Sequence, residues 1–251
     1  MVQLKELLNY ANNVLEIDRF QDYCPNGLQV EGKSEVKKIV SGVTANQALI
    51  DAAIKAKADV LLVHHGYFWK GEDERITGLK YRRIRSLIES EINLLAYHLP
   101  LDAHPLYGNN AKLAELLDLE IAGSFPSGNT AVGMHGRLKN PLSPAEFSQK
   151  VTSTLDREVL HIGDDSQKIQ TIAWCSGAAQ GYIEAAAEVG VDAYLSGEIS
   201  EKTVHVAHES GVHYFAAGHH ATERYGVQAI AEHLSEHFDL EHEFIDIPNP
   251  V

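Results

Sequence analysis

The sequence is poor in the residues and runs that mark several large classes of protein. It has only two cysteines, Cys24 and Cys175, far apart in the chain, so neither a disulfide framework nor a thiolate metal cage is indicated. No apolar run approaches the roughly 18 residues needed to span a bilayer. The first residues, MVQLKELL, are amphipathic and carry an early acid, unlike a secretion signal. We therefore expect no membrane partner and a cytoplasmic location.

Basic residues are also scarce. The chain has 21 Lys and Arg against 35 Asp and Glu, for a formal net charge of −14. Nucleic-acid binding needs clustered cations that displace counterions from phosphates, so the composition disfavours a nucleic-acid partner. The local run KYRRIR (residues 80–85) is typical of a solvated helix face, and a DNA-associated hydrolase stays open only as an alternative. A small-molecule substrate, of which a nucleotide is one example, is favoured instead.

Apolar runs of strand length alternate with helical patterns along the chain. Such alternation predicts parallel strands joined by crossover helices, and hence an α/β fold. The predicted strands are residues 36–43, 60–63, 92–97, 170–175, 192–195, 212–217 and 243–247. The first predicted helix is opened by a capping box over residues 44–47 and ends before Asp59. The others are residues 79–90, 110–117, one opened by Ser143, 179–188, 202–210 and 221–234.

The chain is predicted to divide into two α/β halves, residues 1–125 and 126–251. Between residues 125 and 144 the composition shifts to Pro, Gly, Ser and Asn, which favours a boundary or a crossover there.

The two halves resemble each other. A shift of 133 positions places Ile39 on Ile172 and Asp59 on Asp192, and a shift of 120 places the third strand of the first half on its counterpart in the second. Because the order of elements repeats as well, the sequence indicates an internal duplication.

Polar side chains follow four of the predicted strands at the point where each strand ends. Ligands of open α/β sheets bind beyond the carboxyl ends of parallel strands, so we expect these side chains to converge. A single histidine after a strand is more often a hydrogen-bonded structural residue, but joint placement at four strand ends favours a metal site. In chain order the residues are His64, His65, His98, Asp102, Glu198, His219 and Glu223.

Imidazole and carboxylate together suit divalent Fe, Zn, Mn or Ni. His64 and His65 are adjacent, and in extended backbone they would point to opposite faces, so they are predicted to serve two neighbouring ions. His219 and Glu223 are four residues apart, which places both on one face of a helix. Asp102 adds a carboxylate, and a carboxylate can bridge two ions.

Two other histidine pairs are not predicted to bind metal. His233 and His237 lie in an acidic run, and His205 and His208 lie within a helix away from its start. Both pairs are interpreted as solvated helix faces, because no strand end brings carboxylates to them.

At these strand ends the sequence resembles the NIF-three-like family, also called the GTP cyclohydrolase 1 type 2 homologues. The resemblance covers essentially the whole chain, and it is greatest for the short bacterial members that lack an inserted domain. The motifs that carry it are DYCPNGLQVEG (residues 22–32), VHHGYFWK (63–70), YHLPLD (97–102), GE (197–198) and GHHATE (218–223).

The resemblance implies two intertwined, duplicated α/β halves with mixed, mostly parallel sheets, a ring-shaped homohexamer, and a binuclear metal centre between the halves. It implies Glu223 as a bridging ligand and a supporting or substrate-binding role for His98. Many relatives have His-Thr-Asn-Leu-Asp where this chain has HLPLD, which removes two polar side chains from the neighbourhood of Asp102. The implied ligands are His64, His65, Asp102, His219 and Glu223.

The hypothesis that follows is a metal-dependent hydrolase. Two bound ions would activate water and stabilise an oxyanion, and Glu198 or His98 could move protons, since neither is needed as a ligand. The family's name implies opening of the purine ring of GTP, but the sequence has no Gly-x-x-x-x-Gly-Lys phosphate loop. A non-catalytic metal-binding regulatory or scaffold protein is the alternative.

Overall fold

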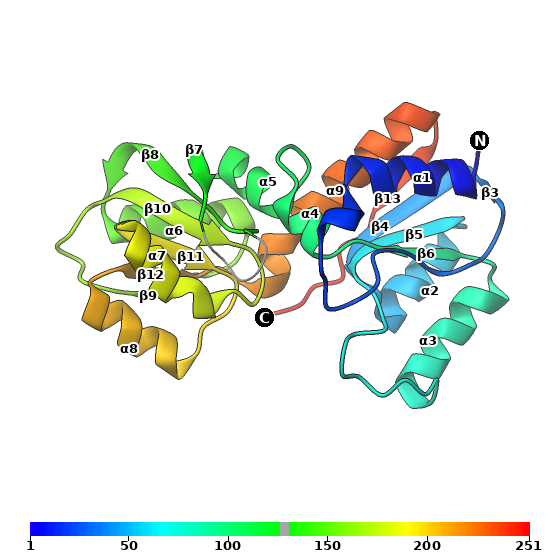
Figure 1. Ribbon diagram of the computed structural model, residues 1–251, viewed down its shortest axis with the longest axis horizontal. Helices are drawn as coiled ribbons and strands as arrows, with labels where there is room; N and C mark the ends of the chain where they lie inside the picture. Colours follow the sequence, from blue (N-terminus) through cyan, green and yellow to red (C-terminus); the bar gives the residue numbers. More distant parts are fainter. Residues whose placement is uncertain (126–130) are drawn as a thin grey trace. The chain divides into compact units, whose positions relative to one another are not determined.

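A computed structural model describes residues 1–125 and 131–251 of the chain, which divides into two compact units (Figure 1). Unit 1 comprises Met1–Leu101 and Gly226–Ile247, and unit 2 comprises Asp102–Tyr225 and Pro248–Val251. These bounds differ from those of the two predicted halves, because unit 1 takes up the later turns of helix α9 (His219–Phe238) and the last strand of the chain.

Unit 1 is built on a five-stranded sheet in the order β13-β4-β5-β6-β2, with β2 alone antiparallel to its neighbour. Apolar residues of the sheet and of α2 and α3 form one core cluster, and α1 lies over the other face (Figure 1). A separate small sheet joins β1 to β3. The elements are β1 (Val2–Gln3), α1 (Leu4–Val14), η1 (Ile17–Arg19), β2 (Gly27–Val30), β3 (Glu35–Val36), β4 (Lys38–Thr44), α2 (Gln47–Lys55), β5 (Val60–His65), α3 (Gly78–Glu89), β6 (Asn93–Ala96) and β13 (Glu241–Phe244).

Unit 2 is built on a six-stranded sheet in the order β7-β8-β10-β11-β12-β9. Strands β10, β11 and β12 are parallel, and the other neighbours pair antiparallel, so the predicted parallel majority holds only for unit 1. Its core packs around Trp174, Phe147 and Phe215. The elements are α5 (Asn109–Leu116), β7 (Leu119–Ser124), β8 (Met134–Leu142), α6 (Pro144–Leu155), β9 (Leu160–Ile162), β10 (Ile169–Cys175), η2 (Gln180–Tyr182), α7 (Ile183–Val189), β11 (Ala193–Ser196), α8 (Glu201–Ser210) and β12 (His213–Ala216). Helix α4 (Leu99–Ala103) spans the point at which the chain passes from unit 1 to unit 2.

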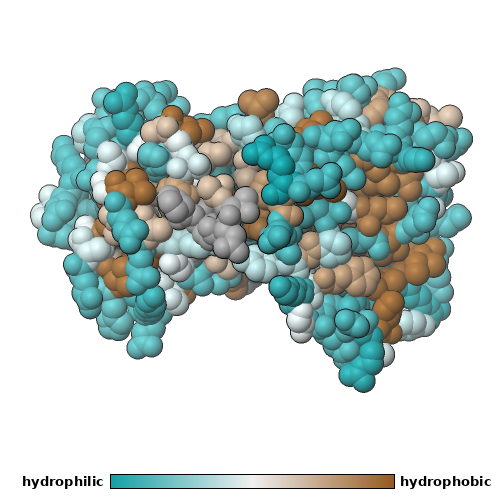
Figure 2. Space-filling model, in the orientation of Figure 1, coloured by the Kyte–Doolittle hydropathy of each residue, from teal (hydrophilic) through white to brown (hydrophobic). Residues whose placement is uncertain are grey.

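The mixed α/β class predicted from the sequence is confirmed. Hydrophilic residues cover most of the visible face of each unit in Figure 2, with apolar patches between them, as expected when most large apolar side chains are buried in two cores. In the described residues, no helix combines the length and the apolar character that crossing a membrane would require.

Several local features differ from the sequence-based expectation. Helix α2 is capped by Asn46, whose side chain accepts a hydrogen bond from Leu49 N at 2.9 Å, rather than by Thr44. Thr44 stays in β4, where it pairs with His65 across the sheet. Strand β5 accordingly runs two residues beyond its predicted end and includes both histidines.

The predicted boundary between residues 125 and 144 is largely a strand. Strand β8 pairs with β7 on one side and β10 on the other, so this segment belongs to the sheet of unit 2; residues 126–130 of the predicted boundary lie outside the described residues. The helix predicted after Ser143 is confirmed, with Ser143 and Glu146 forming a capping box.

The strand registers support the internal duplication. Ile39 of β4 pairs with Val60 of β5, and Ile172 of β10 pairs with Ala193 of β11. The second pair lies 133 positions beyond the first, as the sequence shift requires. The parallel cores of the two units are therefore equivalent residue by residue, so their strand ends are equivalent positions too.

Two aspartates separated by the same shift make the same hydrogen bonds. Asp59 accepts from the backbone N–H groups of Lys37 and Lys38, at 2.8 and 3.1 Å. Asp192 accepts from the N–H groups of the two residues 133 positions further on, at 2.9 and 2.8 Å. Each carboxylate thereby fixes the start of one strand against the start of the next.

Replacing either aspartate with alanine is expected to destabilise the protein by about 2 kcal/mol, because each loss leaves two N–H groups at a strand start without their charged acceptor. Urea unfolding of Asp59→Ala and Asp192→Ala measures this. Asp51→Ala, which removes an exposed carboxylate of α2, is the control and should change the stability by less than about 0.5 kcal/mol. Equal losses of stability in all three variants would show that Asp59 and Asp192 do not fix the starts of the strands.

Candidate metal site

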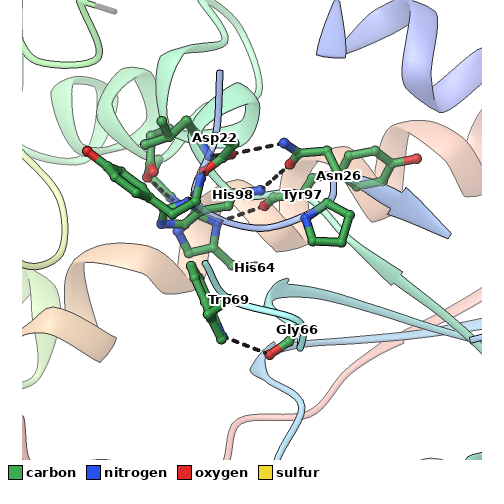
Figure 3. Close-up of polar contacts among 12 residues, drawn as sticks. Asp22, Asn26, His64, Gly66, Trp69, Tyr97 and His98 are labelled. Carbon is green, nitrogen blue, oxygen red and sulfur yellow. Dashed lines mark hydrogen bonds and ion pairs between the residues drawn. The ribbon is translucent and has the colours of Figure 1, made fainter. Parts of the chain in front are cut away.

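Three histidines gather at the carboxyl ends of β5 and β6 in unit 1 (Figure 3). His64 and His65 end β5, and His98 follows β6. One ring nitrogen from each lies within 4.8 Å of the others, so the three could hold a metal ion. The ring centroids of His64 and His65 are 4.5 Å apart, and that of His98 is 5.1 Å from His64.

The prediction that His64 and His65 serve two neighbouring ions was based on side chains that point to opposite faces of the strand, and the two rings do not lie that way. Strand alternation fixes the directions of their Cβ atoms, but the imidazole rings extend further and are placed by the side-chain torsions. The two rings converge although the residues are adjacent, and His64 is fully buried whereas His65 is half-buried.

Each ring of this cluster is held through its Nδ1 atom. Nδ1 of His64 lies 2.9 Å from the carbonyl oxygen of Tyr97, which can only accept, so Nδ1 donates and the neutral ring carries its lone pair on Nε2. Nδ1 of His65 lies 3.2 Å from the hydroxyl oxygen of Thr44. Metal-binding histidines are typically oriented in this way by an outer hydrogen bond.

Asp22 orients His98, and the strand-end reasoning did not find it because it precedes β2 rather than following a strand. Its Oδ1 accepts from His98 Nδ1 at 2.7 Å, and its Oδ2 accepts from Leu99 N and from the Asn26 amide, both at 2.9 Å (Figure 3). Burial opposes ionisation most strongly, but the hydrogen bond and charge of His98, together with the hydrogen bonds from Asn26 and Tyr23, outweigh it, so the pKa of Asp22 lies below its usual value. The only sequence indication was its place in the motif DYCPN.

Cys24 lies beside this pair. Its sulfur, a carboxylate oxygen of Asp22 and a ring nitrogen of His98 are all within 4.8 Å of one another. Burial, with the nearby charge of Asp22, raises the pKa of the Cys24 thiol to about 12. The thiol is therefore protonated at neutral pH and a poor nucleophile.

In unit 2 the first turn of α9 carries His219 and Glu223 on one face, as their spacing predicted. His219 Nε2 lies 3.2 Å from Glu223 Oε2, and His219 Nδ1 donates to Glu198 Oε1 at 2.7 Å. Glu198, predicted as a proton-transfer group, thus contacts His219 in the way that Asp22 contacts His98.

The carboxylates also set the protonation of His219. Burial alone would lower its pKa, but the hydrogen bond and charge of Glu223, followed by those of Glu198, raise the pKa to about 9. A metal-free His219 is therefore protonated at neutral pH.

Without metal, the protein is expected to lose stability as the pH rises. His219 has a higher pKa in the folded chain than its ordinary 6.5, so its contribution is fully present below pH 6.5 and disappears as the pH rises through about 9. Thermal unfolding in a chelating buffer from pH 6 to pH 9.5 measures this loss. His219→Gln should flatten the dependence, and an unchanged slope in that variant would contradict the assignment.

Asp102 lies in α4 and is buried in unit 2. Its Oδ1 accepts from the Ser176 hydroxyl and from the Asn109 amide, both at 2.9 Å. One carboxylate oxygen of Asp102 and one of Glu223 lie within 4.8 Å of each other. The carboxylates of Asp102 and Glu223 are thus close enough to share an ion.

Gly177 makes room for these ligands in the turn that follows β10. Its φ is +67°, and a Cβ there would lie 2.1 Å from Glu223 Oε1 and 3.3 Å from His219 Nε2. Its N–H donates to the Thr222 hydroxyl at 3.0 Å, which ties the turn to α9. Sequence reasoning missed Ser176 and Gly177 because neither is a ligand type, although they follow a strand end.

The structure therefore brings the predicted residues together in two sets. His64, His65 and His98 form a cluster in unit 1, and Asp102, Glu198, His219 and Glu223 form one in unit 2.

The remaining histidine pairs differ from each other. His205 and His208 are exposed, as predicted. His233 and His237 are not simply solvated, because Tyr10 stacks on the ring of His237 at 4.0 Å and its hydroxyl bonds His233 Nε2 at 3.0 Å. That pair attaches α9 to α1 within unit 1.

Comparison with known proteins points to one family over the whole chain. The family described as Duf34/NIF3 (NGG1p interacting factor 3) matches residues 2–250. Proteins named GTP cyclohydrolase 1 type 2 homolog are similar: that of Pseudomonas aeruginosa is 55% identical over 251 residues, covering 100% of this chain and 99% of the relative. That of Vibrio cholerae is 54% identical over 252 residues, with 100% and 99% coverage.

Two solved structures have the same fold. A protein designated ybgI, of unknown function, superposes with a TM-score of 0.95 at 47% sequence identity, with both chains fully covered. A protein from Thermus thermophilus superposes with a TM-score of 0.89 at 33% identity, again over both full chains.

Proposed function

The chain belongs to the Duf34/NIF3 family, and we propose that it is a metal-dependent hydrolase whose two divalent ions are held by His64, His65, Asp102, His219 and Glu223. The observation that carries the proposal is the orientation of the imidazoles. His64 and His219, two of the proposed ligands, donate from Nδ1 to a backbone carbonyl and to a carboxylate, respectively, which leaves Nε2 as the donor to a metal.

The donor chemistry of both sets suits divalent ions. The set in unit 1 offers only imidazoles, whereas that in unit 2 offers one imidazole and three carboxylates, of which Glu198 contacts His219 Nδ1. Asp102 and Glu223 would offset two of the four positive charges of two divalent ions. The remaining positive charge is what activates water and stabilises an oxyanion in this class of hydrolase.

The chain's own groups have distinct parts in this proposal. Glu198 orients His219 through Nδ1, in addition to the proton transfer proposed from the sequence. Asp22 holds His98 with Nδ1 protonated, so His98 can accept or release a proton at Nε2. Gly177 leaves the space that the Glu223 carboxylate occupies.

The test is metal analysis of the purified protein followed by a screen of nucleotide and phosphoester hydrolysis. Wild type should contain two ions, and His64→Ala and Glu223→Ala should each lose metal and at least about 100-fold in turnover. His205→Ala, which changes an exposed histidine of α8, should match wild type. Absence of metal in wild type would refute the proposal.

Full metal content with no turnover would favour the alternative, a non-catalytic metal-binding regulatory or scaffold protein. The DNA-associated alternative gains nothing from α3, where Lys80 pairs with Glu72 and Arg85 pairs with Glu89, so two cations of the basic run are already neutralised. We also propose the homohexamer implied by the family resemblance, which light scattering of the eluting protein tests.

A further inference from the structure

Two aromatic side chains border the histidine cluster of unit 1. The ring of Trp69 lies 5.0 Å from that of His98 and 5.9 Å from that of His65 (Figure 3). The ring of Tyr23 lies 6.3 Å from His98. Tyr23 is nevertheless 59% exposed, and Trp69 is half-buried. Aromatic surface is thus open to solvent directly beside the candidate metal ligands.

The loops that carry these rings are fastened to each other and to the strand end. Lys70 N–H donates to the carbonyl of Tyr23 at 2.6 Å, which joins the two loops. The indole N–H of Trp69 donates to Gly66 O at 3.2 Å, and its backbone N–H donates to the Glu72 carboxylate at 3.1 Å (Figure 3). The indole is therefore held in place although part of it faces solvent.

The turn before Trp69 adopts an unfavourable backbone conformation. Phe68 has a φ of +65°, which is uncommon for a bulky residue and is found mostly where a structure needs a particular placement. Lys80 lies 4.9 Å from the centre of the Phe68 ring and pairs with Glu72, so it supports the turn from α3. The strained turn directs the chain so that Trp69 lies against His98.

We propose that Trp69 and Tyr23 form a subsite that binds a planar aromatic or heteroaromatic ring of the ligand beside the histidine cluster. A ring stacked on fixed, partly exposed aromatic side chains gains contact area while little side-chain freedom is lost, and such stacking tolerates many ring types. The inference rests on the proposed function in that the ring belongs to the substrate of the same site.

A single exposed aromatic residue needs no such explanation, and the chain offers a comparison. Tyr81 on α3 is 47% exposed and makes no ring contact within the described part of the chain. What distinguishes Tyr23 and Trp69 is that both border one histidine and that a backbone hydrogen bond joins their loops. Tyr81 therefore provides the matched control.

The chain's two tryptophans allow a direct test. Trp174 is fully buried in unit 2, so the variant Trp174→Phe leaves Trp69 as the only tryptophan, at the proposed subsite. The emission of Trp69 would be titrated with guanosine, adenosine and benzimidazole, and with ribose 5-phosphate as a ligand without an aromatic ring. The titrations would be made on metal-free and on metal-loaded protein.

Saturable quenching by at least one ring compound, and none by ribose 5-phosphate, is expected. Tyr23→Ala should weaken the binding about ten-fold, whereas Tyr81→Ala should leave it unchanged. Preference for the nucleosides over benzimidazole would identify the ring as a nucleobase. Quenching that stays linear in ligand concentration, or equal effects of the two tyrosine variants, would overturn the inference.

The result of the ring-binding titration can be distinguished from the result of the hydrolysis screen. Ring binding without hydrolysis of any compound would leave the subsite standing and the hydrolase refuted. Hydrolysis of esters that lack a ring, with no saturable quenching, would support the hydrolase and refute the subsite. If Trp174→Phe does not fold, the difference between the titrations of wild type and Trp69→Leu gives the same measurement.

Discussion

Replacing Gly177 with alanine is expected to weaken metal binding by about 10- to 100-fold while the fold is retained. The new Cβ would lie 2.1 Å from Glu223 Oε1, so the carboxylate must move away from its place beside His219. The positive φ adds a backbone cost of about 1 kcal/mol for any residue with a side chain. Competition with a chelating indicator dye measures the affinity, and thermal unfolding measures the stability.

The variant Gly190→Ala separates the displacement of Glu223 from the backbone cost of the positive φ. Gly190 ends α7 with a φ of +80°, so alanine there has the same backbone cost, but nothing lies within 4 Å of the Cβ that it would add. Both variants should therefore lose similar stability, and only Gly177→Ala should lose metal. Equal metal affinity in the two variants would show that Gly177 does not shape the site.

Replacing Asp22 with asparagine is expected to reduce turnover by at least about 10-fold, with the loop largely intact. The amide has the shape of the carboxylate but cannot accept at both ends, and Asp22 accepts from His98, Leu99 and Asn26. His98 would lose the charged acceptor that keeps its Nδ1 protonated. The nitrogen chemical shifts of His98 report the change of tautomer directly, whether or not a substrate is known.

The matched variant is Asp51→Asn, which changes an exposed aspartate of α2 that accepts only from a neighbouring glutamine side chain among the contacts of the described residues. It should leave the His98 signals and the turnover unchanged. If Asp22→Asn keeps the wild-type tautomer of His98, the carboxylate does not orient the ring and its role is confined to holding the loop.

The parts of the fold that were predictable are those that depend on a local pattern of apolar and polar residues. Residues 60–63 and 193–195 are apolar runs bounded by polar residues, and both lie in strands because a buried parallel strand needs apolar side chains on both faces. The antiparallel strands β7, β8 and β9 were missed. Strand β8 lies in a Pro- and Gly-containing stretch whose composition resembles a loop, and one of its two pairing partners, β10, is distant in the sequence.

The members of the candidate site that were predictable are side chains of a metal-binding type that lie at the end of a strand or the start of a helix. His64, His65, His98, His219 and Glu223 follow or begin elements in the pattern expected of an α/β ligand site, and each unit gathers its own members. Asp22, Asn109, Ser176 and Gly177 were not predictable in this way. They act by orienting or making room for other side chains, and such contacts depend on distances that spacing along the chain does not give.

The sequence by itself determined the class of the fold, the duplication and the kinds of side chain in the candidate site, because hydrophobic period, capping residues and side-chain chemistry are local properties. Only the tertiary structure decided which nitrogen each histidine presents and which carboxylate holds it. It also placed two solvent-exposed rings beside the histidines. These features depend on hydrogen bonds and ring contacts between residues such as Asp22 and His98, which are 76 positions apart and meet only when the sheet of unit 1 has formed.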